Sequence, residues 1–212
     1  MKEKVAVYPG SFDPITFGHL DILKRGLRLF DTVICAIATN IEKTGLFTVS
    51  ERMELIRQSI NNDKNVMVDN FEGLLVDYVK RVNARFVIRG LRAMSDFEYE
   101  FQMASMNRNL NCDMDTIFMM TSKDYFFVSS RTIKEVASFG GSVQGFVPAA
   151  VQEALAKKFD DGLNATSAWV RAQTQGNWEE QAPMSDIPTS GVYMRQMIGF
   201  GGMGRRSGKP PK

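Results

Sequence analysis

The feature that most constrains this chain is a regular alternation between short β-branched runs and segments with helical spacing. The runs typical of strands are Val5–Tyr8, Thr32–Ala38, Val66–Asp69, Phe86–Arg89 and Thr116–Met120. Apolar residues recur at three- and four-residue intervals in His19–Phe30, Val49–Ile60, Leu74–Val82 and Asp96–Leu110, and two more helices are expected at Ser130–Ser138 and Pro148–Phe159. This alternation predicts an α/β fold, a doubly wound five-stranded parallel sheet with C-terminal helices.

The composition of the chain changes near residue 160. The stretch from Asp160 to Lys212 contains eight of the 17 glycines and four of the seven prolines, and it has no sustained strand or helix period. Such a segment buries too little apolar surface to offset the entropy lost on ordering. We therefore expect one domain over residues 1–159 and a flexible, disordered C-terminal extension over 160–212.

Bulk composition excludes several classes of protein. Lys+Arg minus Asp+Glu is 26 − 24 = +2. A net charge this small does not indicate binding to nucleic acid or to a membrane surface. The N-terminus lacks the anatomy of a signal peptide, and no apolar run reaches the roughly 18 residues that span a bilayer. Cys35 and Cys112 both lie in apolar surroundings, which predicts two buried free thiols in a cytoplasmic protein.

The loop from Tyr8 to His19 is the first candidate for function. Ligands bind beyond the carboxyl ends of parallel strands, and this long loop follows the first of them. It offers the hydroxyls of Ser11 and Thr16, and His19 is the single histidine of the chain. The helix that follows would present free N–H groups to a phosphate, although the loop is no Walker P-loop. The alternative is a structural turn; we favour function.

The loops after the second and fourth strands carry cations. Lys43 could be a solvated charge or could reach an anion as a mobile point charge. Arg89 ends an apolar strand, where a guanidinium needs an anionic partner, and Arg92 adds a second planar donor. The alternative for each arginine is an ion pair with Asp96 or Glu98. This alternative is stronger for Arg92 than for Arg89.

Two further segments complete the candidate region. In the helix over Asp96–Leu110 we expect Phe97, Phe101 and Ala104 on one packing face and Met103 and Met106 in the core. We expect Glu98, Tyr99 and Glu100 at the helix surface, with one of them toward the nucleotide. Ser129 and Ser130 precede a helix, where they serve as N-caps and also suit a phosphate. Arg131 in that first turn opposes the helix dipole unless an anion is near.

Taken together, these motifs resemble one known family. Thr16-Phe-Gly-His19 resembles the T/H-x-G-H signature of the nucleotidyltransferase superfamily, which has a Rossmann-like fold. The run Arg89-Gly-Leu-Arg92, followed by Asp96-Phe-Glu-Tyr-Glu100 and Met106-Asn-Arg108, is similar to the bacterial phosphopantetheine adenylyltransferases over about residues 4–159. That resemblance implies transfer of the adenylyl group of ATP to 4′-phosphopantetheine, giving dephospho-coenzyme A and pyrophosphate.

The resemblance also implies roles for individual residues. Those implied to act in catalysis are His19, Lys43, Arg89 and Arg92. Those implied to bind the pantetheine substrate are Ser11, Lys43, Leu75 and Arg89. Those implied to bind ATP are Ser11, Phe12, His19, Gly90, Leu91, Arg92, Glu100, Tyr125, Phe126, Phe127, Val128, Ser129, Ser130 and Arg131. It further implies Mg²⁺ held by phosphates and water, a homohexamer, and inhibition by coenzyme A.

An attacking phosphate is already ionised near neutral pH, so this reaction requires positioning and charge stabilisation but no general base. Two other interpretations stay open. One is a relative that adenylylates nicotinamide mononucleotide or cytidylates an alcohol phosphate, against which the Arg89–Arg92 and Asp96–Glu100 runs argue. The other is a non-catalytic nucleotide-binding module whose tail contacts RNA or a partner.

Overall fold

The computed structural model describes residues 3–39, 45–92 and 94–160 of the chain. Its elements are β1 (Val5–Gly10), α1 (Phe17–Gly26), β2 (Thr32–Ala38), α2 (Val49–Ser59), β3 (Val66–Phe71), α3 (Leu75–Arg81), β4 (Phe86–Leu91), α4 (Met94–Leu110), β5 (Asp115–Met120) and α5 (Ser130–Ser138). Residues 149–160 are also helical. The sheet lies in a compact unit over Met1–Glu153, and a second unit begins at Ala154. The predicted extension lies almost wholly outside the described residues.

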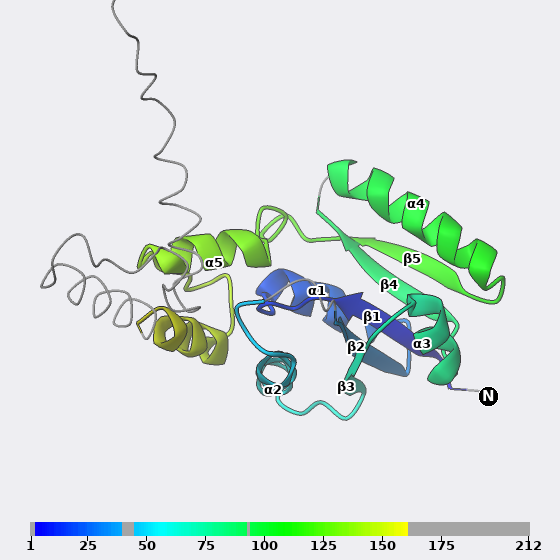
Figure 1. The fold of residues 1–212 in the computed structure, drawn as a ribbon, viewed down its shortest axis with the longest axis horizontal. Helices are drawn as coiled ribbons and strands as arrows, with labels where there is room; N and C mark the ends of the chain where they lie inside the picture. Colours follow the sequence, from blue (N-terminus) through cyan, green and yellow to red (C-terminus); the bar gives the residue numbers. More distant parts are fainter. Residues whose placement is uncertain (1–2, 40–44, 93, 161–212) are drawn as a thin grey trace, which may run out of the picture. The chain divides into compact units, whose positions relative to one another are not determined.

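The five strands form one parallel sheet in the order β3-β2-β1-β4-β5 (Figure 1). The chain builds outward from β1 to β3 and then crosses back to β4 on the other side of β1. Strand order therefore reverses between β1 and β4, and a ligand crevice is expected at the carboxyl ends of these two strands. The doubly wound α/β prediction is confirmed.

The two faces of the sheet are covered by different helices. Val7 and Val87 pack with Val76 and Val79 of α3 in one buried cluster. Gly90 lies on the opposite face, because a Cβ there would come within 3.1 Å of Ile22 in α1. Side chains alternate along a strand, so Arg89, two positions after Val87, points to the same face of the sheet as Val87, which α3 covers.

The predicted strands β1 and β4 proved too short. They were expected to stop at Tyr8 and Arg89, where the β-branched and apolar runs end. In the sheet they continue, since the parallel ladder pairs Gly10 with Ile37 and Gly90 with Met119. This lengthening carries both strands up to the crevice.

Helix boundaries follow their caps. Thr48 and Glu51 form the predicted capping box at the start of α2. Helix α1 begins at Phe17, two residues before the prediction, because Thr16 is its N-cap and His19 is its third residue. It ends at Gly26 and not at Phe30.

Two burial predictions are wrong. Cys35 is a buried free thiol, but Cys112 is exposed, because it lies in the turn after α4 that directs Met114 inward. Met103 and Met106 on α4 are 39% and 58% exposed, not core residues. Helix α4 lies along β4 and β5 (Figure 1), and its apolar side chains are spread around the helix, so that one sheet face cannot cover them all.

Phe97 packs edge-on against Phe118 of β5, as expected for a packing face, yet Phe101 on the same predicted face is 55% exposed. Among the described residues, no helix is long and apolar enough to cross a membrane.

Candidate active site

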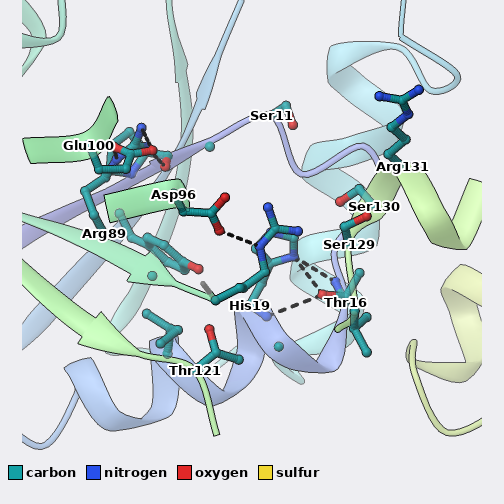
Figure 2. Close-up of a pocket in the computed structure, with 18 of the residues that line it drawn as sticks. Ser11, Thr16, His19, Arg89, Asp96, Glu100, Thr121, Ser129, Ser130 and Arg131 are labelled. Atoms are coloured by element: carbon teal, nitrogen blue, oxygen red, sulfur yellow. Dashed lines mark hydrogen bonds and ion pairs between the residues drawn. The ribbon is translucent and has the colours of Figure 1, made fainter. Parts of the chain in front are cut away.

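A cavity of about 620 Å³ opens at the carboxyl ends of β1 and β4, where strand order reverses. Its walls come from the β1–α1 loop, the end of β4, the first half of α4 and the start of α5 (Figure 2). The structure thus brings together residues that are distant in sequence. The sequence-predicted residues on its walls are Ser11, His19, Arg89, Gly90, Arg92, Glu100, Val128, Ser129, Ser130 and Arg131.

His19 is oriented by the cap of its own helix. The backbone N–H of Thr16 donates to His19 Nδ1 at 3.1 Å, and Thr16 Oγ1 lies 3.0 Å from the same nitrogen (Figure 2). A backbone N–H can only donate, so Nδ1 carries the lone pair and Nε2 carries the proton in the neutral ring. The Nε2–H is therefore the donor that His19 offers to the cavity.

The ring of His19 is held in its neutral form. Burial lowers its pKa from 6.5 to about 4, and the charge of Arg92 adds to this effect. A neutral imidazole with its proton on Nε2 can donate one hydrogen bond to an anion, and this bond strengthens as negative charge accumulates beside it. This is the behaviour expected of a group that stabilises a developing charge.

The ring of Phe12 packs against the ring of His19. Its ring contacts that of His19 edge-on at 5.2 Å and that of Tyr8 at 5.3 Å. Phe12 is 1% exposed, and its φ of 44° lies in the left-handed region, which costs roughly 1–3 kcal/mol for such a residue. Its side chain is not among the described wall residues of the cavity, and its contact with ATP stays a prediction from the resemblance. Packing around the ring offsets the strain and fixes the loop.

Arg89 points from β4 to the sheet face that α3 covers, as strand alternation requires, and there it meets Glu100 of α4. Its Nε and Nη2 donate to Glu100 at 2.6 and 2.8 Å, and its Nη1 donates to the carbonyl of Pro9 at 2.9 Å (Figure 2). Neither expected alternative, Asp96 or Glu98, is its partner. A guanidinium has five N–H donors, so two remain after these three bonds. Arg89 is thereby aimed while keeping donors for an anion.

Arg92 Nε donates to Asp96 at 3.2 Å, so the ion pair that was the alternative interpretation of Arg92 is present. This i,i+4 pair is partly exposed and lies at the wall of the cavity, where surface pairs contribute little stability. An incoming polyanion can therefore compete with Asp96 for the guanidinium. The ion-pair and ligand interpretations of Arg92 are compatible.

The start of α5 provides the opposite wall. Ser129 is the N-cap, and its Oγ accepts from Thr132 N at 2.9 Å. Ser130 Oγ donates to the carbonyl of Pro14 at 2.7 Å, which fastens α5 to the β1–α1 loop. Both serines line the same cavity as His19, whereas the guanidinium of Arg131 points away from His19 (Figure 2). The N-terminal N–H groups of α5 suit an anion in this cavity.

Besides Phe12, four predicted residues do not line the described walls of either cavity. Leu91 is buried, and the ring of Tyr125 packs against Phe17. Phe126 and Phe127 are each 55% exposed and contact one another edge-on. Their assignment to a ligand stays a prediction from the resemblance.

A second cavity of about 380 Å³ adjoins the first. It shares Ser11, Arg89 and Glu100 with the first cavity, and Leu75 at the start of α3 lines it. Its lining is more apolar, and α4 forms one wall. Its wall residues without a sequence signal include Leu74, Met103, Ala104, Asn107 and Thr116. Tyr99, one of the three residues expected to face the nucleotide, lines both cavities. Lys43 lies outside the described residues.

Comparison with known proteins agrees with this geometry. Residues 7–136 match the cytidylyltransferase-like family. The chain is 56% identical over 161 residues to "Phosphopantetheine adenylyltransferase" of Syntrophotalea carbinolica, covering 76% of this chain and 97% of that one. It is also 56% identical over 160 residues to the protein of the same name from Geotalea daltonii, covering 76% and 99%.

A solved structure shows the same fold at low identity. The bifunctional NMN adenylyltransferase/ADP ribose pyrophosphatase from Francisella tularensis superimposes with a TM-score of 0.58 at 13% identity, covering 82% of this chain and 57% of that one. At that identity the likeness concerns the fold alone.

Proposed function

The chain belongs to the phosphopantetheine adenylyltransferases within the cytidylyltransferase-like family, and from that premise we propose that the two cavities together form its active site. The protein is a nucleotidyltransferase that transfers the adenylyl group of ATP to 4′-phosphopantetheine, giving dephospho-coenzyme A and pyrophosphate. The observation that carries the assignment of the site is the placement of His19, Arg89, Arg92 and the start of α5 around one cavity.

The reaction is an in-line displacement at phosphorus. An oxygen of the 4′-phosphate forms a bond to the α-phosphorus of ATP, and the bond from that phosphorus to the bridging oxygen of pyrophosphate breaks. The nucleophile is ionised before it binds, so no proton has to be removed from it. The protein therefore acts by aligning two polyanions and stabilising the charge that develops between them.

His19 is suited to the α-phosphoryl group. Its Nε2–H is a preorganised donor, because Thr16 occupies Nδ1 and because the ring lies on Phe12. A donor that is already oriented needs no reorganisation as the transition state forms. Arg92, Ser129 and Ser130 would receive the leaving pyrophosphate, with the N-terminal N–H groups of α5 as additional donors.

The shared wall of the two cavities is suited to the attacking phosphate. Arg89 and Ser11 belong to both cavities, and two N–H groups of Arg89 remain for an anion beyond Glu100 and Pro9. The pantetheine arm would extend past Leu75 and Met103 into the smaller cavity, where Asn107 provides an amide partner. Lys43 would assist Arg89, as the family resemblance implies.

Mg²⁺ is part of this proposal as the counter-ion of ATP. No group of three or more His, Cys, Asp or Glu among the described residues could hold a metal, and both acidic side chains of the larger cavity, Asp96 and Glu100, pair with arginines. These walls fit an ion that the phosphates and water hold. When bound, the ion would neutralise part of the triphosphate charge.

Three broader properties are proposed on family grounds. Coenzyme A contains both an adenine nucleotide and a pantetheine arm, so it would occupy both cavities and inhibit. A homohexamer would cover exposed apolar residues of α4 such as Phe101 and Met106. A cytoplasmic location is consistent with two cysteines that form no disulfide.

The decisive experiment is turnover of the purified full chain with ATP, Mg²⁺ and 4′-phosphopantetheine. We expect pyrophosphate release together with dephospho-coenzyme A, identified by its mass. Nicotinamide mononucleotide with ATP, and an alcohol phosphate with CTP, serve as controls that should release no pyrophosphate. Binding of ATP without turnover of any of these acceptors would contradict the proposal and favour a non-catalytic nucleotide-binding module.

A further inference from the structure

A buried ionic cluster lies behind the larger cavity, and the proposed chemistry makes no use of it. Its centre is Asp13, which is 5% exposed. Lys134 Nζ of α5 donates to Asp13 Oδ2 at 2.5 Å, and Arg52 Nε of α2 lies 3.4 Å from Asp13 Oδ1. None of these three side chains belongs to the described walls of either cavity. Direct contact with a substrate therefore does not explain the cluster.

The cluster joins the separate chain segments that build the site. Asp13 accepts from Leu46 N at 3.0 Å and from Phe47 N at 2.9 Å, which holds the segment shortly after Lys43. Arg52 also donates to the carbonyl of Ser11 at 3.2 Å. Through Lys134, one turn beyond Ser130, the same carboxylate holds α5. One side chain thus links the β1–α1 loop, the segment entering α2, and α5.

Local packing is fitted to these contacts. A Cβ on Gly45 would lie 1.8 Å from Arg52 Nη2 and 3.1 Å from Asp13 Oδ2, so this position accepts only glycine without rearrangement. Burial alone would raise the pKa of Asp13, but the bonds from Lys134, Phe47 and Leu46 hold it below its ordinary value. The carboxylate is therefore charged at neutral pH and bonded on both oxygens.

The hydrogen bonds that these side chains and Ser130 make to backbone carbonyls have a consequence for positioning. Their lengths and directions are narrowly limited, whereas an apolar contact tolerates sliding. The bonds from Arg52 and Ser130 reach Ser11 and Pro14, at opposite ends of the loop segment that surrounds Asp13. The distance between the His19 side of the cavity and the start of α5 depends on this bracing.

We propose that Asp13, Arg52 and Lys134 are positioning residues that set the spacing between the β1–α1 loop and the start of α5, and hence the fit of the nucleotide phosphates. The inference rests on the proposed function for the identity of the nucleotide as ATP. It assigns a role to three residues that make no direct contact with the reactants.

The test compares Lys134→Met with Lys134→Arg in the full chain. Lys134→Met keeps the apolar stem and leaves Asp13 bonded to two backbone N–H groups and paired at 3.4 Å with Arg52, which donates to the carbonyl of Phe47, so the fold has an intact anchor. We expect the dissociation constant for ATP to rise about tenfold and kcat to fall by a similar factor, because small displacements of phosphate ligands are costly. We expect the KM for 4′-phosphopantetheine to stay within about twofold, because the arm binds in the other cavity.

Lys134→Arg restores a donor to Asp13, and we expect it to recover ATP affinity to within about threefold of the parent protein. Asp13→Asn combined with Lys134→Met tests coupling: if the two act as one unit, the double variant should lose little beyond the worse single variant. Val33→Ala, a buried change near the amino end of β2, serves as the control for lost stability.

Three results would overturn the proposal. They are unchanged ATP binding in Lys134→Met, equal effects on both substrates, or the same kinetic loss in Val33→Ala at a matched melting temperature. A parent protein that binds ATP but does not turn over 4′-phosphopantetheine would instead defeat the proposed function, and the ATP dissociation constants would still decide the role of the cluster.

Discussion

The two cavities at the carboxyl edge of the sheet share Ser11, Arg89 and Glu100 but are built in different ways. The larger is enclosed by helix caps, ion pairs and turns, each held by a hydrogen bond of defined geometry. The smaller has more apolar walls, and α4 contributes one of them through Met103 and Ala104. The larger cavity presents hydrogen-bond donors in fixed positions that suit a charged ligand, and the smaller one offers an adaptable apolar surface.

This difference matches the two demands of the reaction. Phosphoryl transfer requires donors placed within a fraction of an ångström, which only directional bonds provide. A flexible arm needs contact area more than direction, and methionine side chains adapt to irregular shapes. We therefore expect substitutions around the larger cavity to change turnover, and substitutions around the smaller one to change the affinity for one substrate.

The largest expected effect comes from His19→Ala. It removes the preoriented Nε2–H, so we expect kcat to fall at least about a hundredfold while the dissociation constant for ATP changes little. Single-turnover kinetics and calorimetric titration with ATP measure the two quantities. Unchanged turnover would remove His19 from the chemistry, and a large loss of ATP affinity would make it a binding group.

The next effect concerns acidity. The pKa of His19 is about 4 in the folded protein and 6.5 ordinarily, so the unfolded chain takes up a proton as the pH falls below 6.5 while the folded protein does not. The free energy of unfolding is therefore highest above pH 6.5, where the ring is neutral in both states. It decreases as the pH falls from 6.5 toward 4, because only the unfolded chain gains the proton. We expect a loss of at most about 2 kcal/mol in the free energy of unfolding, since the ring borders an open cavity.

Urea denaturation at several pH values measures this loss, with His19→Gln as the matched variant that lacks the titrating group. The chain has a single histidine, so the difference between the two proteins isolates its contribution. Met103→Ala should keep the full pH dependence, because it alters only the smaller cavity. Parallel pH profiles for the parent protein and His19→Gln would show that the ring is not held neutral.

The larger cavity could be predicted far better from sequence than the smaller one. Local sequence is enough to identify the caps and loop donors Thr16, His19, Ser129 and Ser130, because their contacts involve neighbours within a few residues. The alternation of strands and helices placed these loops at one edge of the sheet. Arg89 was predicted as an anion ligand, but its partner Glu100 depends on the rotation of α4, which the sequence pattern left undetermined.

The smaller cavity depends on tertiary packing. Met103 was expected in the core because methionine usually lies there, yet α4 meets the sheet along a narrow contact that leaves this side chain beside the cavity. Asn107 and Thr116 carry no motif and become wall residues only when α4 and β5 are assembled. The cluster around Asp13 was missed for the same reason, since its partners lie 34 and 121 residues away.

The smallest expected effect tests the apolar cavity directly through Met103→Ala. Removing an apolar side chain from a binding surface costs about 1–1.5 kcal/mol, so we expect the KM for 4′-phosphopantetheine to rise about five- to tenfold, with KM for ATP within about twofold. Met106 is the matched control, because it lies on the same helix, is 58% exposed and is absent from the described walls of both cavities. Steady-state kinetics of Met103→Ala and Met106→Ala, each with one substrate varied, should separate the two positions. If both variants raised the same KM equally, the effect would come from α4 as a whole, and the smaller cavity would lose its distinct role.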